Sequence, residues 1–198
     1  MLGLGIASMG VTIIAGNSGA GKTTLAVDLA GAVLMGDEFL GEVTSRQGSV
    51  LFVNCDEPHQ WGQDKLINRG IAGNVPDEKA KVIQDWDVSQ WIRLESTVED
   101  MRPTLIIVDS FNGIHNDPNF DENSAQASQT AKKLERLSAK YCVPIVLIHH
   151  LGKSKDNKGV NKLRGSTAIA ASVSSVLILE GEGTQKRLYQ PKIRGSEL

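Results

Sequence analysis

The feature that most constrains the fold of this chain is an alternation between short apolar segments and longer amphipathic ones. Four short runs are rich in β-branched residues, as buried parallel strands are: residues 11–15, 49–54, 104–109 and 143–149. Helical patterns occupy residues 22–35, 61–71, 89–101 and 124–141. Strand and helix in repeated order predict an α/β fold, with a mostly parallel, twisted sheet flanked by helices.

The end of the chain departs from this alternation. Two further apolar runs, residues 174–179 and 187–193, are separated by the glycine-rich turn Glu180-Gly181-Glu182-Gly183, which predicts a C-terminal β-hairpin. No repeat or low-complexity tract divides the chain. We therefore expect residues 1–198 to form a single domain.

Charge and composition exclude several classes of protein. The chain has 21 Lys and Arg against 23 Asp and Glu, which argues against a wholly basic nucleic-acid coat but permits a local basic stripe. Its apolar runs are far shorter than the ~18 residues of a membrane span, so we expect a cytoplasmic protein with no membrane contact. Cys55 and Cys142 lack metal-ligand spacing, and we interpret both as buried, reduced thiols.

The strongest chemical signal is a match to the pattern GxxxxGK[ST]. Its residues are Gly16, Asn17, Ser18, Gly19, Ala20, Gly21, Lys22 and Thr23. The motif follows a predicted strand and opens a predicted helix, which is the context that a phosphate-binding loop requires. Its glycines let backbone N–H groups face an anion at a helix N-terminus. We expect Lys22 to reach the β- and γ-phosphates of ATP, and the Thr23 hydroxyl to bind Mg²⁺.

Carboxylates are expected near this loop at the ends of two other strands. Asp109 follows four apolar residues, and ligands of open α/β sheets bind at such strand ends, so it is the second expected Mg²⁺ ligand. An Asp in this place is also a common turn former. Asp56 and Glu57 follow another predicted strand, and one of them could activate the attacking water. The alternative for these two residues is a solvated acidic turn before Pro58.

Two polar segments have the composition of functional loops. The first, from His115 to Asn123, is acidic. The second, from Gly152 to Gly165, is basic and could contact a nucleic-acid backbone or form a solvated lid. Its charged residues are Lys153, Lys155, Asp156, Lys158, Lys162 and Arg164.

Together these motifs resemble the RecA-like ATPase superfamily, most closely its branch of hexameric replicative helicases and RepA-type ATPases, the AAA_25 group. The matching stretches are residues 16–24, 50–58, 105–110, 121–123, 146–153 and 163–168. The resemblance implies a RecA-like P-loop NTPase fold that uses ATP and Mg²⁺, with Thr24 in the nucleotide-binding stretch. The family's catalytic glutamate falls on Asp56, whereas Glu57 has the expected residue type, so either acid could serve.

The same resemblance implies roles for basic residues and histidines. His150 stands where the family has the polar sensor of the γ-phosphate, and His149 precedes it at the nucleotide site; alternatively, the pair caps the sheet. Arg164 is expected to face phosphate or a neighbouring subunit. Lys192 and Arg194 resemble the element that inserts an arginine finger into a neighbour's ATP site, although basic residues also protect exposed edge strands.

The leading functional hypothesis is an ATP-hydrolysing motor that acts on DNA, of the helicase or recombination type. It implies a homo-oligomer, expected to be a hexameric ring, that contacts single-stranded DNA through Gly152 to Gly165. The alternative is a regulatory ATPase, similar to the circadian-clock ATPases, whose nucleotide state controls assembly. A small-molecule phosphotransferase is disfavoured, because its lid would be rich in arginine and this basic segment has only Arg164.

Overall fold

The computed structural model describes residues 9–43, 47–55, 59–71, 73–115, 117, 119–122, 124–151 and 167–193. Its centre is a seven-stranded sheet in the order β5-β4-β6-β7-β1-β8-β9. The strands are β1 (Gly10–Gly16), β4 (Val50–Asn54), β5 (Ala80–Gln84), β6 (Leu105–Asp109), β7 (Pro144–His150), β8 (Ser175–Glu182) and β9 (Gln185–Ile193). Neighbouring strands are parallel except for β8 and β9, which form an antiparallel hairpin. The predicted mostly parallel sheet and terminal hairpin are confirmed.

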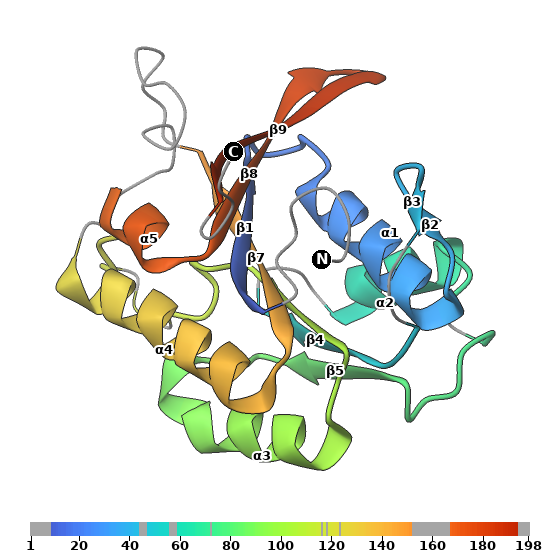
Figure 1. The fold of residues 1–198 in the computed structure, drawn as a ribbon, viewed down its shortest axis with the longest axis horizontal. Helices are drawn as coiled ribbons and strands as arrows, with labels where there is room; N and C mark the ends of the chain where they lie inside the picture. Colours follow the sequence, from blue (N-terminus) through green and yellow to red (C-terminus); the bar gives the residue numbers. More distant parts are fainter. Residues whose placement is uncertain are drawn as a thin grey trace.

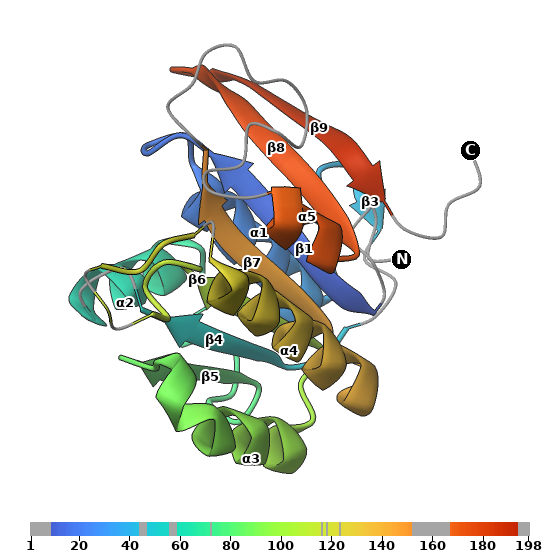
Figure 2. The ribbon, with the colours of Figure 1, turned by 90° about the vertical axis from the view of Figure 1, so that its left-hand side faces the viewer.

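Helices cover both faces of the sheet (Figures 1 and 2). Helices α1 (Lys22–Met35) and α2 (His59–Asn68) lie on one face, and α3 (Trp91–Met101), α4 (Ala125–Tyr141) and α5 (Thr167–Ser172) lie on the other. Alternate residues of each strand enter the two cores, because successive side chains point to opposite faces. Ile14 and Ile148 pack beneath α1, whereas Ile13 and Leu147 pack beneath α4. We name these the α1 face and the α4 face.

Several elements differ from the sequence expectations. Strand β5, helix α5, the 3-10 turn Val88–Gln90 and the small sheet of β2 (Glu38–Phe39) and β3 (Glu42–Val43) were not predicted. The hairpin strands run to Glu182 and resume at Gln185, so the turn lies later than expected. The prediction that both cysteines are buried was wrong. Cys55 is half-buried, and Cys142, which follows α4 in the left-handed conformation at φ 52°, is exposed.

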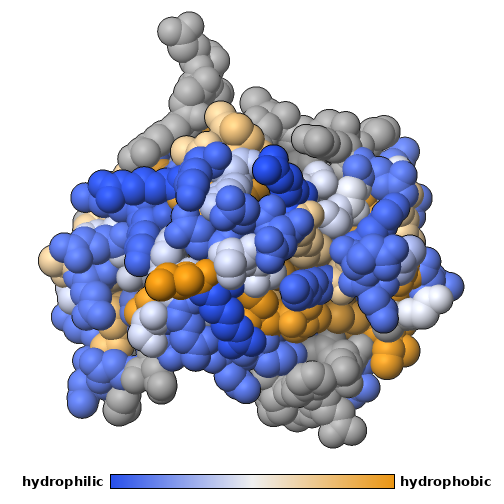
Figure 3. Space-filling model, turned by 90° about the horizontal axis from the view of Figure 1, so that it is seen from below, coloured by the Kyte–Doolittle hydropathy of each residue, from blue (hydrophilic) through white to orange (hydrophobic). Residues whose placement is uncertain are grey.

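The surface agrees with a sheet enclosed between two helical layers. Seen from below, the molecule is mostly hydrophilic, with limited apolar areas (Figure 3). In the described part of the chain, no helix has the length and apolar character that crossing a membrane requires.

Candidate functional site

The carboxyl ends of four parallel strands bring the candidate residues to one edge of the sheet. Gly16, at the end of β1, is paired in register with His150 of β7, and Asn54 of β4 is paired with Asp109 of β6. Alternation along the strands places Asn54, Asp109 and His150 on the α1 face, the face to which the loop after Gly16 leads.

The loop between β1 and α1 needs its glycines for backbone conformation and close approach. Gly19 and Gly21 adopt φ of 75° and 96°, which residues with a Cβ rarely tolerate. A Cβ added to Gly16 would lie 2.7 Å from the carbonyl oxygen of Leu179. The N–H of Ala20 donates to the carbonyl of Asn17, at 3.1 Å, which closes the loop into a tight turn. The loop therefore has the curvature of an anion cradle at the start of α1.

Two polar side chains of α1 lie at the base of this cradle. Lys22 is buried, and its Nζ donates to the carbonyl of Asn17 at 3.0 Å. The Thr23 hydroxyl donates to Oδ2 of Asp109 at 2.6 Å. The two residues predicted as Mg²⁺ ligands are thus in contact, although they come from distant parts of the sequence. A hydroxyl and a carboxylate are oxygen ligands of the kind that Mg²⁺ prefers, and Lys22 supplies the charge that a phosphate requires, so the residues fit both groups.

The acids Asp56 and Glu57 lie outside the described residues, but the chain that leads to them is well anchored. The N–H of Cys55 donates to the carbonyl of Asp109 at 2.7 Å. The side-chain amide of Asn54 donates to Oε1 of Gln84 at 2.9 Å. The residues before the acid pair are therefore attached to the end of β6, directly beside Asp109.

The two histidines that end β7 lie on opposite faces of the sheet. His150 is half-buried on the α1 face, beside Gly16. His149 is 1% exposed on the α4 face, where its Nε2 lies 4.0 Å from Oε2 of Glu122 and its ring packs edge-on against Phe111. Both had been expected at the nucleotide site, and the structure brings only His150 to the face that carries Thr23 and Asp109.

Lys192 is engaged within its own chain at the opposite end of the sheet. Its Nζ donates to the carbonyl of Val173, at 2.9 Å, and to that of Ala170 within α5. Lys192 pairs with Val176, and Val176 pairs with Ile13, three residues before Gly16. Arg164, Arg194 and the basic segment from Gly152 to Gly165 lie outside the described residues.

Sequence reasoning assigned no role to two buried groups beside the site. One is Glu122, which matched a family motif but was not connected with His149. The other is His115, whose ring stacks on Phe120 with centroids 3.6 Å apart. Burial lowers the pKa of His115 to about 4, so this imidazole is neutral at pH 7. Both residues lie in the acidic loop that the sequence analysis singled out, and this was the available signal. The contact of Glu122 with His149, however, depends on the tertiary structure.

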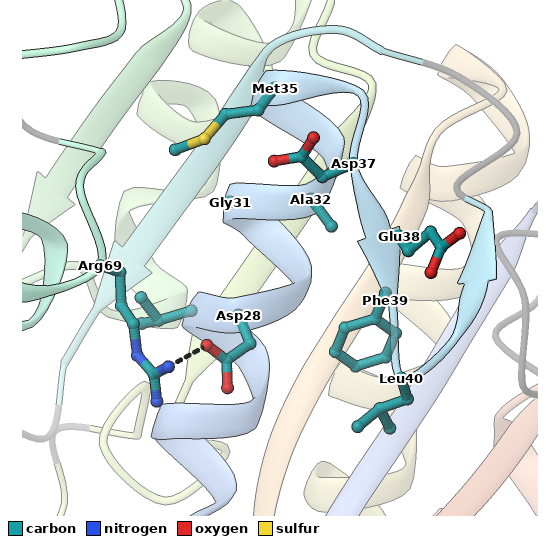
Figure 4. Close-up of a pocket in the computed structure, with 10 residues that line it drawn as sticks. Asp28, Gly31, Ala32, Met35, Asp37, Glu38, Phe39, Leu40 and Arg69 are labelled. Carbon is teal, nitrogen blue, oxygen red and sulfur yellow. Dashed lines mark ion pairs between the residues drawn. The ribbon is translucent and has the colours of Figure 1, made fainter.

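A separate groove of about 320 Å³ runs along the outer side of α1 (Figure 4). Asp28 and Arg69 line this groove, point toward one another and form an ion pair of 2.5 Å. Burial raises the pKa of Asp28, and Arg69 opposes that rise. The groove is lined neither by Lys22 nor by Asp109, so it is distinct from the phosphate cradle.

This sheet, with a GxxxxGKT loop at the end of β1 and an Asp at the end of β6, defines a RecA-like P-loop ATPase domain. Comparison with protein families agrees: the AAA_25 model, described as an AAA domain, matches residues 3–156. The chain therefore belongs to the AAA_25 family.

Curated relatives share less than a quarter of their aligned residues with this chain. The DNA repair protein RadA of Bacillus subtilis is 22% identical over 184 residues, which cover 92% of this chain and 35% of the relative. The DNA repair protein RadA of Haemophilus influenzae is 24% identical over 188 residues, which cover 94% of this chain and 36% of the relative. The chain thus spans about a third of the length of these relatives.

Proposed function

We propose that the chain binds ATP and Mg²⁺ at the loop from Gly16 to Thr23, hydrolyses ATP, and works as an ATP-driven motor on DNA. The observation that carries the proposal is the 2.6 Å hydrogen bond from Thr23 to Asp109. It joins the two side chains that hold Mg²⁺ in P-loop sites, and it lies next to a buried lysine.

Each residue then has a defined task. Lys22 exchanges its hydrogen bond with the Asn17 carbonyl for bonds to phosphate oxygens. Thr23 and Asp109 hold Mg²⁺, which neutralises charge on the phosphate oxygens when it is bound. Asp56 or Glu57 orients the attacking water and accepts its proton. His150 contacts the γ-phosphate, since it is the polar residue at the end of β7 that shares the α1 face with the cradle.

The proposal extends to DNA and to assembly. The relatives are named as DNA repair proteins, and the segment from Gly152 to Gly165 carries five basic residues (Lys153, Lys155, Lys158, Lys162 and Arg164) that could bind a phosphate backbone. Arg194, and with it Lys192 and Arg164, would act at the interface of a homo-oligomer, for which we propose a hexameric ring. In support, Lys192 lies toward the end of the sheet away from its own cradle.

The test is the rate of ATP hydrolysis with and without single-stranded DNA, with Lys22→Ala as the inactive control. The proposal predicts Mg²⁺-dependent hydrolysis that single-stranded DNA stimulates and that raised salt suppresses. Hydrolysis without stimulation, together with no salt-sensitive DNA binding, would overturn the DNA part alone. If the chain also changes size with nucleotide in gel filtration, the regulatory assembly ATPase replaces the motor.

A further inference from the structure

The α4 face holds a buried polar contact that the proposed chemistry does not use. His149 is 1% exposed and Glu122 is 6% exposed, and Nε2 of the histidine lies 4.0 Å from Oε2 of the glutamate. His149 is the residue before the last of β7, whereas Glu122 lies two residues before Ser124, the N-cap of α4. Removing such groups from water is costly, so a contact of this kind is expected where it fixes the relative position of two segments.

A third segment meets the same histidine. The Phe111 ring packs edge-on against His149, with centroids 5.4 Å apart and planes at 76°. The N–H of Phe111 also donates to the carbonyl of Ile148 at 2.9 Å. Phe111 is two residues after Asp109, so the end of β6, the approach to α4 and the end of β7 converge on His149.

The opposite face of the same strand end belongs to the candidate nucleotide site. His150 follows His149, pairs with Gly16 in the register of β7 and β1, and points to the α1 face. The N–H of Leu151 donates to the carbonyl of Gly16 at 3.3 Å. Consecutive peptide units are planar and share an α-carbon, so a displacement of His149 also displaces His150.

We propose that Glu122 and His149 are positioning residues: their contact holds the end of β7 so that His150 keeps its place beside the phosphate cradle. His149 is then a support for the site rather than a ligand of the nucleotide. The kinetic part of this inference rests on the proposed ATPase function, whereas the structural part does not.

The structural part is tested by NMR of the full 198-residue chain labelled with ¹⁵N-histidine and ¹⁵N-glycine. The chain has only four histidines, so their ring signals can be assigned. Glu122→Gln removes the carboxylate charge at nearly constant volume, and we expect the ring signals of both His149 and His150 and the amide signal of Gly16 to shift. Glu95→Gln, at the surface pair of Glu95 and Lys140, is the matched control and should shift none of them.

The kinetic part is tested by steady-state ATP hydrolysis and by titration with a fluorescent ATP analogue. We expect Glu122→Gln and His149→Gln each to lower kcat about tenfold, with nucleotide Kd changed less than about twofold. The double variant should be no slower than either single variant, because both remove one contact. Glu122→Asp keeps the charge, so it should recover part of the loss.

Three results would overturn the inference. One is a shift of the His149 signal alone, because the pair would then be a purely local structural contact. Another is a loss of nucleotide affinity as large as the loss of kcat, because His149 would then contact the nucleotide. The third is multiplying losses in the double variant. If Glu122→Gln does not fold, His149→Gln decides by the ring signal of His150 and the amide signal of Gly16, which should both shift. A wild-type chain without ATPase activity would contradict the proposed function, while the NMR result would still decide the positioning role.

Discussion

The two faces of the sheet differ in how they use polar side chains at the same edge. On the α1 face, Thr23 and Asp109 lie in contact beside a glycine-rich loop, at the end of the sheet where ligands of α/β folds bind. On the α4 face, His149 and Glu122 are both buried, and the His149 ring packs against Phe111. Adjacent residues of β7 therefore serve two purposes: one faces the site and the other holds the strand end in place.

The largest expected effect comes from removing the positive charge of Lys22 at the phosphate cradle. Lys22→Ala should weaken ATP binding by about 100-fold, because it deletes charge-assisted hydrogen bonds to phosphate. The measurement is calorimetric titration with ATP and Mg²⁺, with the exposed Lys140→Ala as a control that keeps wild-type affinity. Retained tight, Mg²⁺-dependent binding would refute the assignment of the cradle.

A smaller effect is expected when only the metal contact is lost. Thr23→Val keeps the size of the side chain but removes the hydroxyl that contacts Asp109, so we expect hydrolysis to slow by about 30-fold and to need more Mg²⁺. Initial rates measured across a Mg²⁺ titration give both quantities, with Thr97→Val on the surface of α3 as the matched control. An unchanged Mg²⁺ requirement would show that Thr23 is not a ligand.

On the α4 face, the expected effect is a change of folding stability with pH rather than a change in nucleotide binding. The pKa of His115 falls from 6.5 to about 4 on burial, so below pH 6.5 the unfolded chain takes up a proton that the folded chain does not. The contribution of His115 to the free energy of unfolding therefore decreases as the pH decreases through this window. We expect a loss of about 1.5 kcal/mol from His115 between pH 6.5 and pH 5. His115→Phe should flatten the curve measured by urea unfolding. An equally steep curve in this variant would exclude His115 as the cause.

The hairpin end of the sheet offers the subtlest comparison, because it tests action between subunits. Arg194→Ala and Lys22→Ala should each be inactive, yet random mixing should restore about a quarter of the wild-type rate per site, since some interfaces combine an intact cradle with an intact arginine. The measurement is hydrolysis in assemblies shown to be mixed. No recovery in such assemblies would make Arg194 a structural residue.

The α1 face could be predicted from the sequence because its signals are local. The loop motif is contiguous, and Asp109 follows an apolar run whose end defines the sheet edge. Helix α1 was predicted with the bounds that the structure has. Strand β5 was missed because it lies at the edge of the sheet and only Ile83 of its five residues is buried. Helix α5 has six residues, too few for a helical periodicity to be recognised.

The α4 face could be predicted only in part. The helix over residues 124–141 was expected, and Ala127, Ala131, Leu134 and Leu137 form its buried side. The contact of Glu122 with His149 joins segments separated by the whole of α4 and most of β7, and no local pattern encodes it. The sequence alone predicts that consecutive strand residues such as His149 and His150 point to opposite faces. It does not reveal which residue each histidine meets on its face.

The most direct test of the central claim is a crystal structure of the chain with Mg²⁺ and a non-hydrolysable ATP analogue. The account predicts phosphates within hydrogen-bond distance of Lys22, Mg²⁺ bound by Thr23 and Asp109, and His150 facing the γ-phosphate while His149 stays beside Glu122. An analogue bound instead in the groove that Asp28 and Arg69 help to line, or Mg²⁺ bound at Glu122, would contradict it.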